Sequence, residues 1–128
     1  MRAAGYSSAV PNLGEEWIVD AGECDPVRLQ DMTAVQQMLG ELVTALALNV
    51  VIQPVFHKFD GEGGVTGLYL LAESHLACHT YPEHQSLTLN LYSCKPKPRF
   101  DYEGLLLRGV GARLVHVRRV ERGAGAAP

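Results

Sequence analysis

The spacing of apolar residues divides the chain into short strands and amphipathic helices. Leu87, Leu89 and Leu91 alternate with polar residues as far as Cys94, so one side of this strand is predicted to be buried and the other polar. Runs rich in β-branched, leucine and aromatic residues predict five strands in all. Their expected ranges are 16–21, 50–59, 65–72, 87–94 and 113–120.

Two segments have helical periodicity. Asp25-Pro26 is a typical helix start, and apolar residues then recur every three or four positions to Leu46, with a break expected near 31–33. A shorter helix is predicted at 101–110. Because the strands come in neighbouring pairs separated by helices, the predicted fold is α+β, a two-layer sandwich with a mainly antiparallel sheet and helices on one face. We expect a single domain over 1–128, with loose ends at 1–14 and 123–128.

Composition narrows the class of protein. With 128 residues, 47% hydrophobic and 20% charged, the chain suits one globular core, and its longest apolar stretch is about half of a membrane span. Three cysteines, an odd number and too few for a disulfide framework, favour reduced thiols, and the missing CxxC pair argues against structural zinc. Together with the short apolar stretch, this predicts a cytoplasmic protein without a membrane partner. The net charge is −3, and the basic residues of the C-terminal third are too dispersed to predict nucleic-acid binding.

Residues 73–84 concentrate reactive groups: three of the five histidines, one thiol and two carboxylates. Metal binding by His75, His79 and His84 with Cys78 or Cys94 is one interpretation. The spacing of His75 and His79 would suit a helix, but the residues around His79 favour a strand, so no metal site is predicted. Ser74 lacks the glycines of a hydrolase nucleophile elbow. Inert polar residues on a strand edge are a third interpretation, against which the density of reactive groups argues.

A longer pattern of motifs resembles the prokaryotic S-adenosylmethionine decarboxylase proenzymes, which are pyruvoyl-dependent. The resemblance extends from about residue 15 to residue 123. Its central motifs are Gly64-Val65-Thr66-Gly67, Ala72-Glu73-Ser74-His75-Leu76, His79-Thr80-Tyr81-Pro82-Glu83-His84 and Leu91-Tyr92-Ser93-Cys94, and the flanking segments Glu16–Ala21, Cys24-Asp25-Pro26 and Val117–Gly123 fit as well.

The resemblance implies that the chain cuts itself between Glu73 and Ser74. Two fragments would result, a β chain of 1–73 and an α chain of 74–128, and Ser74 would become the pyruvoyl cofactor at the new N-terminus. A pyruvoyl ketone can form a Schiff base with the substrate amine and take up the electrons left by the departing CO2. The implied product is the aminopropyl donor of spermidine biosynthesis.

The resemblance also implies roles for other residues. His79 corresponds to a histidine that aids processing, and Cys94 to the cysteine that reprotonates the substrate carbon. Three residues correspond to substrate-site positions: Glu83 to a carboxylate that contacts ribose hydroxyls, Phe59 to an aromatic residue that stacks on adenine, and Thr66 to a position that is often serine. A homodimer is implied, with sites near the subunit boundary.

Alternative activities remain open at this point. Some relatives with this architecture act on ornithine or arginine, and the sequence differs from the family's commoner pattern at 21–23, near the expected substrate site. An unprocessed, non-catalytic binding protein is the alternative from another class.

Overall fold

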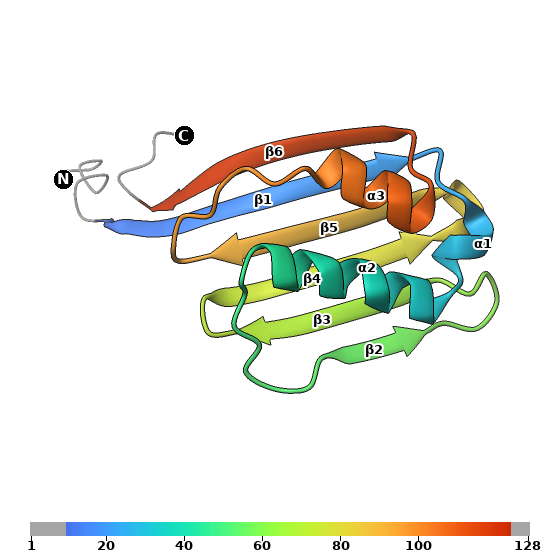
Figure 1. Cartoon of the computed structure of the whole chain (residues 1–128), viewed down its shortest axis with the longest axis horizontal. Coiled ribbons are helices and arrows are strands. Elements are labelled where there is room, and N and C mark those ends of the chain that lie inside the picture. The colour runs from blue at the N-terminus through green and yellow to red at the C-terminus, as the bar shows by residue number, and fades with distance from the viewer. Residues whose placement is uncertain (1–9, 124–128) are drawn as a thin grey trace.

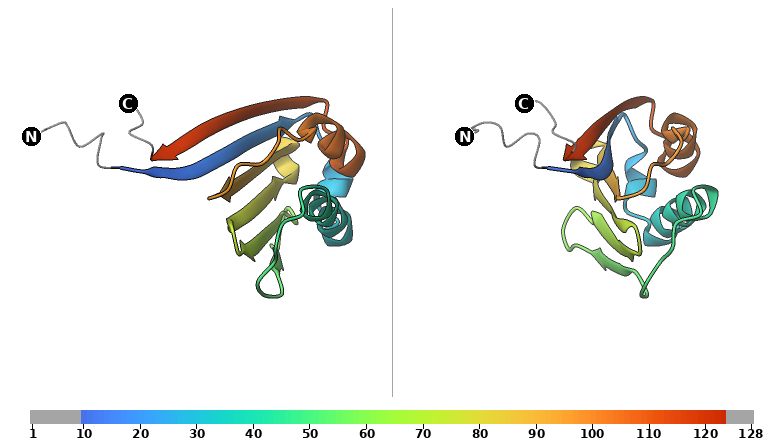
Figure 2. Two further views of the ribbon diagram at one scale, coloured as in Figure 1. Left: turned by 60° about the vertical axis from the view of Figure 1, so that its left-hand side comes forward. Right: turned by 90° about the vertical axis from the view of Figure 1, so that its left-hand side faces the viewer.

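The computed structural model describes residues 10–123, which form one six-stranded antiparallel sheet covered by helices on one face (Figures 1 and 2). The strand order is β2-β3-β4-β5-β1-β6. This confirms the predicted α+β class. The elements in chain order are β1 (Asn12–Gly22), α1 (Pro26–Leu29), α2 (Met32–Ala45), β2 (Val55–Lys58), β3 (Val65–Leu71), β4 (Ser74–Tyr81), the 3₁₀ turn η2 (Pro82–His84), β5 (Ser86–Ser93), α3 (Tyr102–Val110) and β6 (Leu114–Gly123).

The expectation of five strands is wrong, because the reactive segment itself forms a sixth. β4 pairs with β3 on one side and β5 on the other. Alternate positions from Leu76 to Thr80 are buried, as in a strand with one covered face, but the polar residues between them obscure this pattern in the sequence. The strand expected over 50–59 is also too long: β2 covers only Val55–Lys58, after Pro54, which has no N–H to donate to a neighbouring strand.

The ends of the described chain differ from the expectation as well. β1 begins at Asn12 and β6 ends at Gly123, and these two residues are cross-strand partners. The loose ends expected over 1–14 and 123–128 are therefore wrong for residues 12–14 and for Gly123. Residues 10 and 11 lie outside the strands, as expected, and 1–9 and 124–128 lie outside the described residues.

Carboxylate side chains cap the helices, as the helix-start signal predicts. Asp25 accepts a hydrogen bond from the N–H of Val27, and Asp31 accepts one from Ala34. The second cap interrupts the predicted helix and separates α1 from α2, which confirms the expected break. None of the helices within residues 10–123 is both long and apolar enough to cross a bilayer.

The sheet has one covered face and one bare face (Figure 2). Alternate strand residues such as Val19, Leu76 and Leu89 are buried beneath the helices and form the core with them. On the opposite face, Leu68 and Leu70 remain about half exposed. That face carries the polar positions of β4 and β5, so the tertiary structure leaves it available for a site or a partner.

Candidate active site

The candidate site residues lie at the two ends of β4 and do not form a single cluster. Ser74 begins this strand and His79 follows five residues later. At 3.3 Å per residue, the two backbone positions are about 16 Å apart. In Figure 1, the β3–β4 turn lies at one end of the sheet and the end of β4 lies at the other.

The first cluster, which we call the cleavage end because the family resemblance predicts cleavage there, consists of Glu73, Ser74 and Cys94. Ser74 is the register partner of Ser93, so the antiparallel pairing of β4 with β5 brings Cys94 opposite Glu73. The backbone N–H of Cys94 donates a hydrogen bond of 2.9 Å to the Glu73 carbonyl. This donor polarises the carbonyl and would stabilise negative charge developing on its oxygen.

The backbone at the cleavage end is strained. Ser74 has a φ of +153°, which residues with a side chain rarely adopt. Nearby, Gly14 has a φ of +110°, and a Cβ there would come within 2.6 Å of the Cα of Cys94. A glycine at this position therefore allows β1 to lie close against the backbone of Ser93 and Cys94.

Polar groups surround the buried carboxylate of Glu73. The backbone N–H and side-chain amide of Asn49 donate to it at 3.2 and 2.8 Å, and the ammonium of Lys97 lies 3.5 Å away. Burial alone would raise the pKa of Glu73, but these hydrogen bonds and the charge of Lys97 outweigh it and hold the pKa below its ordinary value. Glu73 is therefore an ion held in the protein interior.

A second buried carboxylate holds the segment after Cys94 in place. Glu15 accepts hydrogen bonds from the Lys97 backbone N–H at 2.8 Å, from Arg119 at 2.7 Å and from the Trp17 indole at 3.1 Å. Burial acts to raise the pKa of Glu15, but the three hydrogen bonds and the Arg119 charge lower it below 4.5.

Replacing Glu15 with glutamine should lower the thermal unfolding midpoint at pH 7 by about 3 to 10 °C, because the buried donors lose their anionic partner. A lowered folded-state pKa stabilises the protein above the unfolded value of 4.5, and this stabilisation is lost as pH falls through the folded value. The difference between wild type and variant should therefore shrink between pH 7 and pH 3 when both are followed by circular dichroism. Glu121→Gln, at an exposed neighbour of Arg119, is the matched control. A pH-independent difference would contradict this account.

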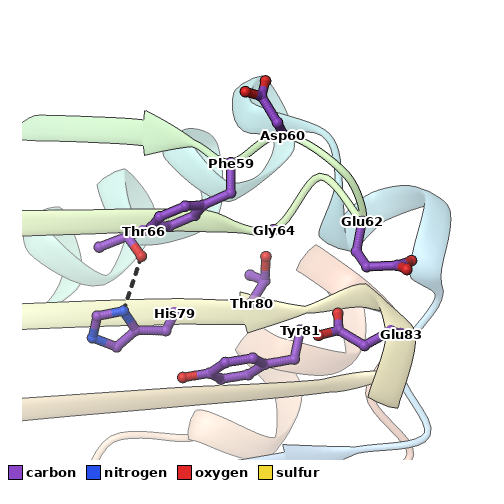
Figure 3. Close-up of a pocket in the computed structure, with 9 residues that line it drawn as sticks. All are labelled: Phe59, Asp60, Glu62, Gly64, Thr66, His79, Thr80, Tyr81 and Glu83. Carbon is purple, nitrogen blue, oxygen red and sulfur yellow. Dashed lines mark hydrogen bonds between the residues drawn. The ribbon is translucent and has the colours of Figure 1, made fainter.

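The second cluster lines a pocket of about 360 Å³, which lies where β3 starts and β4 ends (Figure 3). At its floor the hydroxyl of Thr66 and Nδ1 of His79 are 3.0 Å apart, across a direct register pair of the two strands. The Phe59 and Tyr81 rings lie on either side of this pair in Figure 3. The lining residues are Phe59, Asp60, Glu62, Gly64, Thr66, His79, Thr80, Tyr81 and Glu83.

The cysteines separate by environment. Cys24 and Cys78 are buried, which raises the pKa of each thiol, to about 11 and about 12. Cys94 is exposed. Cys78 packs in the core, on the face of β4 opposite His79. Within residues 10–123, no group of three or more His, Cys, Asp or Glu side chains is arranged to hold a metal ion.

The structure adds residues that sequence reasoning missed. Tyr81, Asp60 and Glu62 line the pocket, and Asn49 and Lys97 contact Glu73. Tyr81 stands in the motif that carries the family resemblance and could have been found there. Asn49 and Lys97 are 24 residues apart from Glu73 on either side, and no local pattern signals their contact with it.

Comparisons with known proteins agree with one another. A family model described as S-adenosylmethionine decarboxylase matches residues 15–123. The S-adenosylmethionine decarboxylase proenzyme of Thermococcus gammatolerans is 30% identical over 120 residues, covering 91% of this chain and 80% of its own length. That of Bacillus cytotoxicus is 30% identical over 118 residues, covering 88% and 86%. The crystal structure of the adenosylmethionine decarboxylase from Aquifex aeolicus superposes with a TM-score of 0.74 at 26% identity, covering 88% of this chain and 92% of that one.

Proposed function

Because the chain belongs to the S-adenosylmethionine decarboxylase family, we propose that it is a self-cleaving, pyruvoyl-dependent decarboxylase of S-adenosylmethionine, active in the cytoplasm and serving spermidine biosynthesis. The observation that carries the proposal is the geometry of the Glu73–Ser74 bond: a strained serine follows a carbonyl that already accepts a hydrogen bond from Cys94. Family membership does not favour the ornithine, arginine or non-catalytic alternatives.

Self-cleavage begins with the Ser74 hydroxyl. Its oxygen adds to the carbonyl carbon of Glu73, the C–N bond breaks, and the hydroxyl proton passes to the released nitrogen, so that the amide becomes an ester. A base then removes the Cα proton of Ser74, and its Cβ–O bond breaks with Glu73 leaving as a carboxylate. The remaining dehydroalanine tautomerises, adds water and loses ammonia, which leaves the pyruvoyl group on residues 74–128.

The residues at the cleavage end suit the formation and use of a pyruvoyl group. Relief of the strained Ser74 backbone favours the first step, and the Cys94 N–H faces the oxygen that gains negative charge. Once formed, the pyruvoyl group supplies the carbonyl that accepts electrons during loss of CO2. Cys94, exposed beside it, donates a proton to the substrate carbon.

We propose that His79 of one chain removes the Cα proton of Ser74 in a second copy of the chain. Within one chain the two residues are about 16 Å apart along β4, which is too far for direct proton transfer. Two copies can pack with their sheets facing each other, related by a two-fold axis that runs between the sheets and perpendicular to the strands. The start of β4 in one copy then lies opposite the end of β4 in the other. A homodimer packed in this way brings His79 of one chain near Ser74 of its partner.

The bare face of the sheet supports this homodimer. It exposes apolar side chains that a monomer would leave in water, among them Val55, Leu68 and Leu70. A two-fold dimer buries the same surface on both copies, so one patch is enough for both sides.

The pocket at the start of β3 and the end of β4 would hold the nucleoside part of the substrate. Phe59 is about half exposed and can stack on adenine, and Glu83 can accept hydrogen bonds from ribose hydroxyls. Thr66 keeps the His79 ring oriented through the hydrogen bond between them. We propose that the same dimer places this pocket beside the partner's cleavage end.

Intact mass spectrometry of the purified protein tests the proposal directly. We expect two fragments, 1–73 and 74–128, and a mass for the second that corresponds to a pyruvoyl group in place of the N-terminal serine. In a substrate panel, S-adenosylmethionine should give CO2 release, whereas ornithine and arginine should not. An active protein that remains a single chain would disprove the mechanism, and release from ornithine or arginine alone would disprove the substrate.

A further inference from the structure

A lysine-containing loop contacts the side chain at the proposed cleavage position. The segment after β5 reads Lys95-Pro96-Lys97-Pro98, and each lysine precedes a proline, which favours an extended backbone. Lys95 is exposed, whereas Lys97 turns inward with only 14% of its side chain exposed. In Figure 1 this segment, the segment after α2 and the β3–β4 turn all lie at the same end of the sheet.

The ammonium of Lys97 bridges two elements. It lies 3.5 Å from the Glu73 carboxylate and donates to the Leu46 carbonyl, at the end of α2, at 3.4 Å. Among residues 10–123, it is the one cation within 4.0 Å of that carboxylate. The lysine backbone is fixed in turn by the hydrogen bond from its N–H to buried Glu15.

Asn49 holds the same turn from the other side. Its carbonyl accepts a hydrogen bond of 2.8 Å from Ala72, while its backbone N–H and side-chain amide donate to Glu73. Together with the Cys94 N–H on the Glu73 carbonyl, these contacts hold both the side chain and the carbonyl of Glu73. A scissile residue held in this way has little freedom to rotate its carbonyl away from the attacking hydroxyl.

We propose that Lys97 is a positioning residue for self-cleavage: with Asn49 it anchors the Glu73 carboxylate, and so keeps the scissile carbonyl on the Cys94 N–H and within reach of the Ser74 hydroxyl. This inference rests on the proposed function, since it assigns a role in that self-cleavage. Lys97 acts on the first step, ester formation, because it holds the acyl side of the bond and not the serine Cα.

The test follows the appearance of the two fragments on denaturing gels after cell-free synthesis. Lys97→Met should slow cleavage about 10- to 100-fold, the scale expected when a reacting group is misplaced. Lys97→Arg should restore most of the rate, and Lys95→Met, with the same pre-proline context but an exposed side chain, should cleave like wild type. In a Glu73→Gln background, Lys97→Met should add little, because the ion pair is already lost.

Hydroxylamine identifies the step, because it cleaves esters but not amides under mild conditions. It should not rescue Lys97→Met, in which the ester forms slowly. Rescue by hydroxylamine, wild-type cleavage by Lys97→Met, or the same slowing in the Glu73→Gln background would each overturn the role of Lys97 and leave self-cleavage itself standing. A wild-type chain that never cleaves would instead remove the proposed function, and this inference with it.

Discussion

Co-expression of a His79→Ala chain with a Ser74→Ala chain should restore cleavage of the first chain, although neither is cleaved at an appreciable rate alone. Ser74→Ala lacks the attacking hydroxyl. His79→Ala lacks the proton acceptor, and its self-cleavage should be about 10²- to 10⁴-fold slower. In a mixed dimer, the Ser74 of one chain meets the intact His79 of the other. A C-terminal tag on the Ser74→Ala chain distinguishes the products on a denaturing gel.

Co-expression of His79→Ala with a Ser74→Ala/His79→Ala double variant is the control, because no intact His79 is then present and no cleavage should occur. If the first mixture yields no fragments while its chains assemble, His79 does not act across the dimer. Wild-type cleavage by His79→Ala alone would remove the histidine from processing altogether. The experiment therefore tests the 16 Å separation along β4 as a functional constraint.

Cys94→Ala should lower turnover of S-adenosylmethionine by about 10²- to 10⁴-fold and leave self-cleavage nearly unchanged. The two effects separate because the thiol donates a proton to the substrate, whereas the backbone N–H, which alanine keeps, holds the Glu73 carbonyl. Fragment formation on gels and CO2 release per cleaved chain measure the two steps independently.

Cys24→Ala is the matched control, since Cys24 is a buried thiol whose pKa burial raises to about 11. Its loss should cost some stability but no turnover per cleaved chain. Equal loss of cleavage and turnover in Cys94→Ala would mean that the side chain, and not only the backbone, serves processing. Unchanged turnover would remove Cys94 from the proton-donor role.

Local sequence pattern was sufficient to predict much of the secondary structure of this protein. The alternation at Leu87, Leu89 and Leu91 identified a buried strand face. Asp25-Pro26 marked a helix start and a break was expected near 31–33, both of which the structure confirms. β4 was missed as a strand because reactive polar residues occupy its bare-face positions. Motif resemblance identified the family, which the comparisons confirm, and proposed Ser74, His79 and Cys94 as a set.

The sequence by itself determined which residues carry reactive groups and which strand faces are apolar, because both properties depend on residue type and on spacing along the chain. Only the tertiary structure decided which groups meet. Antiparallel pairing brings Cys94 to Ser74 across 20 positions of sequence, yet the same extended strand separates Ser74 from His79, only five positions away. The contacts of Lys97 and Asn49 with Glu73 depend on how loops end at one edge of the sheet, and no short-range pattern encodes that.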